Sequence, residues 1–399
     1  MKTLILLTSE FPYGKGETFI ENEFPFLLNG FEEIIIFSES NKGESRINNS
    51  SVQVHLMQSI SWKSRISSLF NKEFYRELNY LRKKAKFNLS TFRSAWYSLS
   101  KALTISKQLE TIDKKEPGVF YSYWLDEKSL ALSFLKKKRS NIKVVSRGHG
   151  WDIYEDRHPN NYLTYRNLLA ENLDSVYTIS ENGNSYLVNR YPRLKEKLQT
   201  SRLGTMPLLS FKEKSNIGLF HILSISSIIP LKRVDKILDV VSSIPNLKIK
   251  WTHIGNGPES EKNKIKDLAI QKSQLNQNFS FELMGHLTNS KVRELLSTNF
   301  FDFFINLSET EGIPVSIMEA QSAGIPVLAT AVGGTPEIVN DENGILVDKD
   351  ENITQKIIDY LNLPEVEKQK KRELSYQNWK ENYNAETNYT NFIQTILKL

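Results

Sequence analysis

Residues 303–330 constrain the fold of this chain more than any other stretch, because they predict a strand, a loop, a helix and a second strand in close succession. Residues 303–307 read Phe-Phe-Ile-Asn-Leu, a short apolar run suited to a buried strand. A helix should begin near Pro314, since proline lacks the N–H that would be unpaired in the first helical turn. Gly324 ends it, because glycine tolerates the left-handed conformation and the residue before the following proline avoids the helical region. Residues 327–330 are the next strand.

The start of this helix predicts a binding site for an anion. A helix N-terminus next to a glycine-containing loop offers unpaired N–H groups and the positive end of the helix dipole. Glu311 lies in the loop, and Glu319 lies about 7.5 Å along the helix from Pro314 at ~1.5 Å per residue. Such a pair could bracket a diphosphate, one carboxylate binding sugar hydroxyls and the other a ribose. The spacing alone also fits an ordinary loop charge and a solvated helix position.

The whole run resembles the donor-binding motif of the GT4 family of retaining glycosyltransferases, which have the GT-B fold. The residues that carry the resemblance are Glu311, Gly312, Ile313, Pro314, Val315, Glu319, Ala320, Gly324 to Val327, Gly333, Gly334 and Pro336 to Val339. The resemblance implies an α/β protein with two Rossmann-like domains facing across a cleft. It also implies that residues 311–315 bind the sugar and the diphosphate of a nucleotide sugar, with Glu319 on the ribose.

Chain length agrees with two domains, since 399 residues exceed one ordinary core. We place an N-terminal, acceptor-binding domain at 1–205 and a donor-binding domain at 217–377. As in GT-B proteins, a helix at about 378–399 should pack back on the first domain. The chain has no cysteine, and its six histidines show no metal-ligand spacing, so neither disulfides, metal nor another cofactor is expected. Without a membrane span or a signal peptide, we expect a cytoplasmic protein.

Positive charge is concentrated in the first half, where residues 1–205 hold 31 Lys and Arg against 22 Asp and Glu. Residues 58–115 are basic, with apolar side chains at helical spacing. They suit an anionic membrane surface at the inner face of the cell membrane, or else helices packed on a sheet with a solvated basic face. No nucleic-acid recognition motif accompanies the charge. The apolar positions are Trp62, Ile66, Leu69, Phe70, Phe74, Leu78 and Leu81.

Two candidate site segments follow predicted strands of the first domain. Gly14, Lys15 and Gly16 follow the first strand, where a backbone loop can approach a phosphate, with Lys15 also a weak candidate for the acceptor. His149 and Asp152 lie in a loop that resembles the GT4 His-Gly-x-Asp loop. The resemblance puts His149 on the transferred sugar and leaves Asp152 as a weaker acceptor-binding candidate.

Lys232 matches the GT4 lysine that neutralises the donor phosphates, but the arginine expected five residues earlier is Ser227. Either Arg233 or a residue of the first domain replaces that cation, or the leaving group is less stabilised. The loop containing Leu287 corresponds to the one that contacts the nucleotide base in related enzymes.

The resemblance therefore implies the function of a hexosyltransferase, with His149, Lys232 and Glu311 as catalytic residues. It would move a sugar from a UDP- or GDP-sugar to a hydroxyl of a glycan or lipid-linked acceptor in bacterial-type surface glycan synthesis, with retention and without a metal. The alternatives are a nucleotide-sugar epimerase on the same fold and a non-catalytic subunit that binds nucleotide sugars. Fold alone does not separate these functions.

Overall fold

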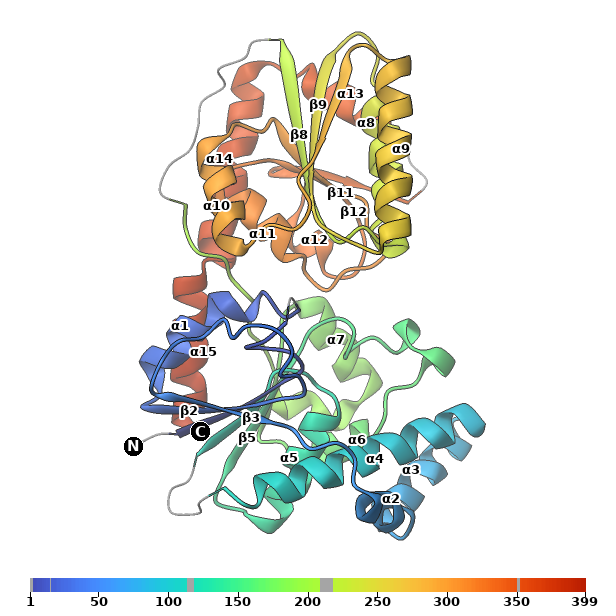
Figure 1. The fold of residues 1–399 in the computed structure, drawn as a ribbon, viewed down its shortest axis with the longest axis vertical. Helices are drawn as coiled ribbons and strands as arrows, with labels where there is room; N and C mark the ends of the chain where they lie inside the picture. Colours follow the sequence, from blue (N-terminus) through green and yellow to red (C-terminus); the bar gives the residue numbers. More distant parts are fainter. Residues whose placement is uncertain (1–2, 15, 113–117, 209–217, 350–351) are drawn as a thin grey trace. The chain divides into compact units, whose positions relative to one another are not determined.

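The computed structural model describes residues 3–14, 16–112, 118–208, 218–349 and 352–399. The chain divides into two compact units, the first made of Met1–Arg202 and Thr387–Leu399 and the second of Leu203–Glu386. Each unit is an α/β body built on its own parallel sheet (Figure 1).

The sheet of unit 1 has the strand order β3-β2-β1-β4-β5-β6-β7, and all neighbours are parallel. Its strands are β1 (Thr3–Thr8), β2 (Glu33–Ser38), β3 (Val52–Leu56), β4 (Val119–Ser122), β5 (Lys143–Gly148), β6 (Ser175–Thr178) and β7 (Leu198–Thr200). The helices are α1 (Ile20–Gly30), α2 (Trp62–Leu69), α3 (Lys72–Lys83), α4 (Leu89–Leu109), α5 (Glu127–Lys138), α6 (Arg166–Asn172), α7 (Glu181–Arg190) and α15 (Ala385–Lys398).

Two apolar layers cover the two faces of this sheet. On one face, Leu4 and Leu6 of β1 pack with Phe24 of α1 and Phe392 of α15. On the other face, alternate residues of the same strands pack against α3 to α7. Because both faces are covered, the central strands β1, β4 and β5 are buried at nearly every position, as is usual for parallel sheets.

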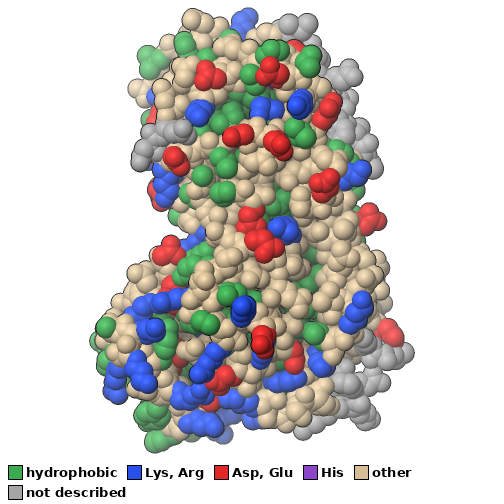
Figure 2. Space-filling model, turned by 180° about the vertical axis from the view of Figure 1, so that it is seen from behind, with side chains coloured by type: hydrophobic (Ala, Val, Ile, Leu, Met, Phe, Trp, Pro, Cys, Tyr) green, Lys and Arg blue, Asp and Glu red, His purple; other side chains and the backbone are tan. Residues whose placement is uncertain are grey.

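Of the segment 58–115, the structure describes residues up to 112, and these include three helices on the second face whose burial differs from one to the next. Phe74, Leu78 and Leu81 of α3 are buried in the core, as packed helices predict. In α2, by contrast, Ser64 and Ser68 are buried. Trp62 and Ile66 of α2 are 66% and 50% exposed. Lys and Arg side chains gather at the lower left of Figure 2, over α2, α3 and α4. No helix of the described ranges has the length and hydropathy needed to cross a bilayer.

The sheet of unit 2 has the order β10-β9-β8-β11-β12-β13, again with all neighbours parallel. Its strands are β8 (Leu219–Ile225), β9 (Lys248–Ile254), β10 (Phe279–Leu283), β11 (Phe303–Asn306), β12 (Val327–Thr330) and β13 (Gly344–Val347). The helices are α8 (Val234–Ser242), α9 (Glu259–Leu275), α10 (Asn289–Thr298), α11 (Val315–Ser322), α12 (Thr335–Ile338), α13 (Ile353–Leu361) and α14 (Glu365–Asn382). Figure 1 shows α10, α11 and α14 on one side of the sheet and α8, α9 and α13 on the other.

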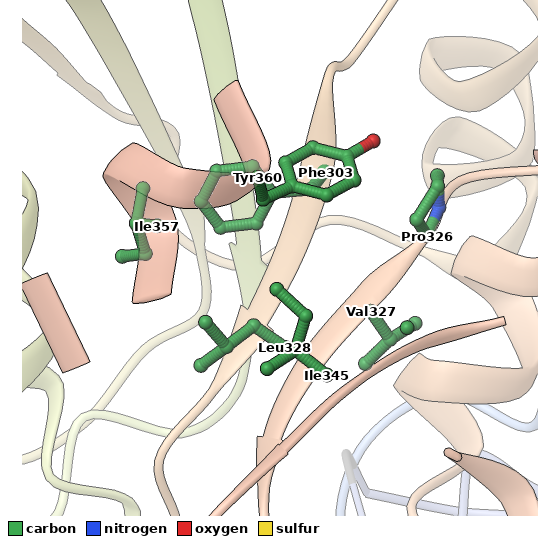
Figure 3. Close-up of a pocket in the computed structure, with 8 residues that line it drawn as sticks. Phe303, Pro326, Val327, Leu328, Ile345, Ile357 and Tyr360 are labelled. Carbon is green, nitrogen blue, oxygen red and sulfur yellow. The ribbon is translucent and has the colours of Figure 1, made fainter. Parts of the chain in front are cut away.

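An apolar gap lies in the core of unit 2, under α13 (Figure 3). Phe303 of β11 and Tyr360 of α13 meet edge to face there, with ring centroids 5.7 Å apart. The free volume is about 10 Å³, at the lower limit for one water molecule. We therefore treat this gap as part of the packed core.

The returning segment at the C-terminus is shorter than expected. We predicted that a helix from about residue 378 would leave the second domain, but unit 2 extends to Glu386. Trp379 of α14 is the reason: it is 1% exposed, and its ring N–H donates to Thr205 Oγ1 at 2.9 Å. Of the C-terminal segment 378–399, residues 387–399 belong to unit 1.

Candidate active site

Two loops at the carboxyl edge of the unit 2 sheet bring Lys232 and Glu311 together. Residues 226–233 follow β8 and residues 307–314 follow β11, and these two strands are neighbours at the point where the strand order reverses. Open parallel sheets bind ligands at such reversals, because the two connections leave in opposite directions and open a crevice. The loops are joined by a hydrogen bond from Glu309 N–H to Leu231 O, at 2.9 Å.

Lys232 and Glu311 form an ion pair at this edge. Lys232 Nζ lies 2.5 Å from Glu311 Oε1. Asn306 Nδ2 donates to the same carboxylate oxygen at 3.3 Å. The two side chains are 22% and 10% exposed, so a ligand can reach a pair that is already oriented. The sequence analysis did not predict a role for Asn306. A polar residue at the end of an apolar strand is the feature that could have indicated one.

Gly334 holds the loop of Glu311 in place. Its N–H donates to Gly312 O at 2.8 Å. A Cβ on residue 334 would lie 2.4 Å from that oxygen, so only glycine permits this approach. On the other side of the loop, Thr330 Oγ1 donates to Ser308 O at 2.6 Å. The site loop is thus fixed by its own chain before any ligand binds.

The helix expected near Pro314 begins at Val315, with Pro314 as its N-cap residue. The first bonds of the helix are made by Ile317 and Met318, whose N–H groups donate to Pro314 O. Within the described residues, the N–H groups of Val315 and Ser316 have no partner. Gly312 and Ile313 lie in the loop immediately before. The structure thus contains the helix end at which the sequence predicts an anion, and binding of the anion stays a prediction.

Glu319 is a buried residue of α11, with 9% of its surface exposed. Burial raises the pKa of its carboxyl to about 7, and the nearby positive charge of Arg293 opposes this rise. A solvated helix position, the ordinary alternative for this residue, is therefore wrong.

Ser227 stands at the position of the expected arginine. Ser227 is exposed, and Arg233 is the N-cap residue of α8 with a left-handed backbone, φ 50°. Leu287, the candidate for contact with the nucleotide base, follows β10 in a loop whose start is tied to β9. There Met284 N–H donates to His253 O at 3.0 Å, and Gly255 N–H donates to Gly285 O at 2.8 Å.

In unit 1, His149 lies directly after β5 in a box of aromatic rings. Its ring centroid is 4.6 Å from Trp124, 4.9 Å from Tyr123 and 5.4 Å from Phe19. The side chain is buried, Nδ1 lies 3.9 Å from Asp152 Oδ2, and neither Nδ1 nor Nε2 has a partner among the described residues at hydrogen-bonding distance. Buried polar atoms are nearly always paired, so this imidazole is suited to bonding a ligand.

Asp152 organises the loops around His149. One carboxylate oxygen accepts from His149 N–H and the other from Leu125 N–H, each at 2.7 Å. Burial alone would raise the pKa of this carboxyl, but the hydrogen bonds and the charge of His149 lower it below its usual value. Both oxygens thus already have partners inside the protein. The structure assigns Asp152 a positioning role, and contact with an acceptor stays a prediction.

In the loop after β1, the two backbone N–H groups that we expected to be available to a phosphate already have hydrogen-bond acceptors. Gly14 N–H donates to Lys42 O at 3.0 Å, and Gly16 N–H donates to Glu10 Oε2 at 2.8 Å. An anion could bind these amides only by displacing those oxygens. The candidate Lys15 lies outside the described residues.

Sequence reasoning did not identify Glu17, which shapes this loop. Its carboxylate accepts from the N–H groups of Ser9, Glu10 and Phe11 and from the indole N–H of Trp124. Glu17 therefore fixes the β1 loop beside the ring that contacts His149. Nothing in the local sequence distinguishes Glu17 from an exposed loop glutamate.

Comparison with known proteins bears on the family of the second unit and on the fold. Residues 207–381 match the family of glycosyl transferases group 1. A GtfA subunit of a UDP-N-acetylglucosamine–peptide N-acetylglucosaminyltransferase from Streptococcus agalactiae is 26% identical over 196 residues, covering 48% of this chain and 37% of the relative. An uncharacterized glycosyltransferase of Methanocaldococcus jannaschii is 26% identical over 287 residues, covering 70% and 75%. The O-antigen biosynthesis glycosyltransferase WbnH of Escherichia coli is 24% identical over 216 residues, covering 53% and 58%.

The chain spans about a third of the length of the first two curated relatives that it matches. Solved structures match nearly the whole chain. HepE of Anabaena, in complex with UDP and glucose, has a TM-score of 0.70 at 14% identity, covering 99% of this chain and 100% of its own. Sucrose-phosphate synthase of Thermosynechococcus elongatus has a TM-score of 0.71 at 14% identity, covering 100% and 99%. The chain thus has the GT-B fold, and its second unit matches the glycosyl transferases group 1 family.

Proposed function

We propose that this protein is a retaining glycosyltransferase of the GT4 type. It moves a hexose-type sugar from a nucleoside diphosphate sugar to an acceptor hydroxyl. The observation that carries the proposal is the Lys232–Glu311 pair at the strand-order reversal of unit 2. The loop of Glu311 leads into α11, where the N–H groups of Val315 and Ser316 have no partner in the part of the chain that the structure describes.

The chemical need of such a reaction is to stabilise the negative charge that grows on the departing diphosphate. Lys232 and the N-terminal amides of α11 provide fixed positive charge and hydrogen-bond donors for it. In this proposal Glu311 binds sugar hydroxyls, Glu319 binds the ribose, and His149 of unit 1 binds the sugar. No metal is assigned a role.

We propose a front-face route for retention. The bond from C1 to the phosphate oxygen breaks, the acceptor oxygen bonds to C1 on the same face, and the leaving phosphate takes the acceptor proton. The contacts of Glu311 support this choice, because its Oε1 is bonded to Lys232 and Asn306. Such a carboxylate suits binding and charge balance better than attack on C1.

Kinetics of Lys232→Ala and Glu311→Ala test the site. We expect each to lower turnover about 10²–10³-fold, the usual cost of losing a group that stabilises transition-state charge. The matched control is Lys250→Ala, which breaks another Lys–Glu pair of unit 2, 2.8 Å from Glu282. That variant should keep its activity, and circular dichroism should show all three folded. Wild-type transfer rates in both site variants would contradict the assignment.

The donor class can be found with a thermal-shift panel of UDP-, GDP- and dTDP-sugars. The complex of HepE with UDP and glucose makes UDP-sugars the first choice. A donor at about 100 times its dissociation constant should stabilise the protein by roughly 2.7 kcal/mol. Conversion of the donor to another nucleotide sugar without any acceptor would instead indicate an epimerase. The likeness to WbnH supports a glycan or lipid-linked acceptor of surface glycan synthesis.

We further propose that α2 and α3 bind an anionic membrane surface. Trp62, Ile66 and Phe70 recur every four residues along one side of α2 and the residue after it, and they are 66%, 50% and 80% exposed. Residues 62–93 hold nine Lys and Arg and only two acidic residues, Glu73 and Glu77, both buried. An apolar ridge among cations fits anionic headgroups above an acyl layer.

A further inference from the structure

A second cavity of unit 1 opens at the edge of the sheet where the strands begin. Its volume is about 1000 Å³, at the upper end of the range of small-molecule binding sites. Thr3 of β1, Glu33 of β2 and Gly118, just before β4, line it. His149 follows the end of β5, at the other edge of the same sheet. The cavity is therefore separate from the residues to which the transfer reaction is assigned.

The floor of this cavity is an apolar face of the sheet. The strand register places Phe120 of β4, Ile5 of β1 and Ile35 of β2 side by side. Neighbouring strands lie about 4.8 Å apart, so the three side chains cover about 10 Å of the floor. Phe37 continues this face, and the ring of His55 stacks on it with the centroids 5.2 Å apart. Such a floor suits the apolar body of a small ligand.

Arg139 brings a positive charge to one side of the floor. It is the C-cap residue of α5, and its guanidinium carbon lies 5.8 Å from the ring centroid of Phe120. Its Nη1 is buried without a hydrogen-bond partner in the part of the chain that the structure describes. Buried polar atoms are nearly always paired. The three lysines before it, residues 136–138, each lie within 3.0 Å of a carboxylate oxygen. The charge of Arg139 is therefore the one at this helix end that suits an anionic ligand.

Carboxylates line the β2 side of the cavity. Both oxygens of Glu33 accept hydrogen bonds from neutral groups, Thr3 Oγ1 at 3.3 Å and Gln53 Nε2 at 2.9 Å. Glu32, the residue before it, is exposed and also lines the cavity. These two carboxylates repel a second negative charge on the ligand. The cavity thus suits a ligand with one negative charge, placed on the β4 side.

We propose that this cavity binds a small organic monocarboxylate with an apolar body. The carboxylate would pair with the guanidinium of Arg139, since arginine presents parallel N–H donors that match a carboxylate. The apolar body would lie across Phe120, Ile5 and Ile35. Monocarboxylate binding is independent of the proposed function, because Lys232 and Glu311 belong to unit 2.

The test measures binding to the full chain without any nucleotide sugar, by saturation-transfer NMR and calorimetry. The probes are hexanoate, 4-phenylbutyrate and indole-3-propionate, each compared with its neutral amide. We expect at least one carboxylate to bind, and its amide to bind about tenfold more weakly. Phenyl phosphate should bind more weakly than the carboxylates, because it brings a second negative charge.

Arg139→Gln should weaken carboxylate binding about tenfold, a loss of roughly 1.4 kcal/mol, and should remove the preference over the amide. Lys138→Gln is the matched control, since it removes the same charge from the next residue. Lys138 is 57% exposed, is paired with Glu110 and is not among the described residues that line the cavity. It should bind like the wild type. Gln53→Phe, at an exposed lining position, should block binding by filling the cavity.

Circular dichroism should show all three variants folded. The proposal is wrong if no carboxylate binds, if the amides bind as tightly as the carboxylates, or if Arg139→Gln and Gln53→Phe bind like the wild type. Nucleotide-sugar thermal shifts on the same samples separate the two proposals. A donor shift without carboxylate binding refutes only the cavity, and carboxylate binding without a donor shift refutes only the transferase.

Discussion

At the scale of single residues, two buried or half-buried ion pairs differ in what they do. Arg147 and Glu23 of unit 1 are both 0% exposed, 3.5 Å apart, with the guanidinium 4.2 Å from the ring of Phe392. That pair joins α1, β5 and the C-terminal segment, and no ligand can reach it. Lys232 and Glu311, in contrast, keep part of their surface open at the edge of a sheet. This difference in access is what the proposed function requires of Lys232 and Glu311.

Glu319 makes the stability of unit 2 depend on pH. Its folded pKa of about 7 lies above the ordinary value of 4.5, so the folded state favours the protonated carboxyl. The stability that this protonation gives to unit 2 is fully present below pH 4.5 and is lost as the pH rises through 7. The loss is on the order of 3 kcal/mol at 1.36 kcal/mol per pKa unit. We expect the melting temperature to fall between pH 5 and 8, and to fall less in Glu319→Gln. The same fall in both proteins, measured by calorimetry, would contradict the burial argument.

At the scale of elements, the strand, loop and helix that carry Glu311 could be predicted well from the sequence, because the residues that define them are close together in the chain. The apolar strand, Pro314 and Gly324 define β11 and α11, whose observed start is one residue later than expected. The burial of α2 was not predictable in this way. Its buried side is made of serines, with Ser68 Oγ 2.9 Å from Ser100 Oγ of α4, and this contact depends on a helix distant in sequence.

The proposal that the protein binds an anionic membrane rests on the exposed side of α2. We expect the protein to float with vesicles of phosphatidylglycerol at low salt and to be released as salt screens the cations. Replacing Trp62, Ile66 and Phe70 together by Ser should abolish flotation. The control replaces Leu275 of α9, which is 77% exposed but lies in the other unit. No flotation of the wild type at low salt would refute the membrane proposal.

At the scale of the whole molecule, the chain passes between the units twice, and both passages are held by unit 2. Thr205 N–H donates to Tyr383 O at 3.0 Å, and Ala385 N–H donates to Thr205 O at 3.1 Å. A Cβ on Gly204 would lie 2.5 Å from Ala385, so the two segments run in close contact. The sequence predicted a returning tail but not where it leaves unit 2. The point at which the tail leaves unit 2 depends on the pairing of Thr205 with Asn384, which are about 180 positions apart in the sequence.

Trp379→Ala tests this arrangement. Because the indole is buried and bonded to Thr205, its removal should destabilise unit 2 by about 3–5 kcal/mol, the usual cost for a large core aromatic. Calorimetry should show the transition of unit 2 at a lower temperature, with that of unit 1 little changed. An unchanged transition for unit 2 would show that Trp379 does not anchor the tail.

The most direct measurement is a crystal structure with the nucleoside diphosphate sugar that gives the largest thermal shift. We expect the diphosphate at the N-terminus of α11, within hydrogen-bonding distance of the N–H groups of Val315 and Ser316 and of Lys232 Nζ, with Glu311 on the sugar and Glu319 on the ribose. A donor bound elsewhere, or one bound without contact to either glutamate, would contradict the proposed site.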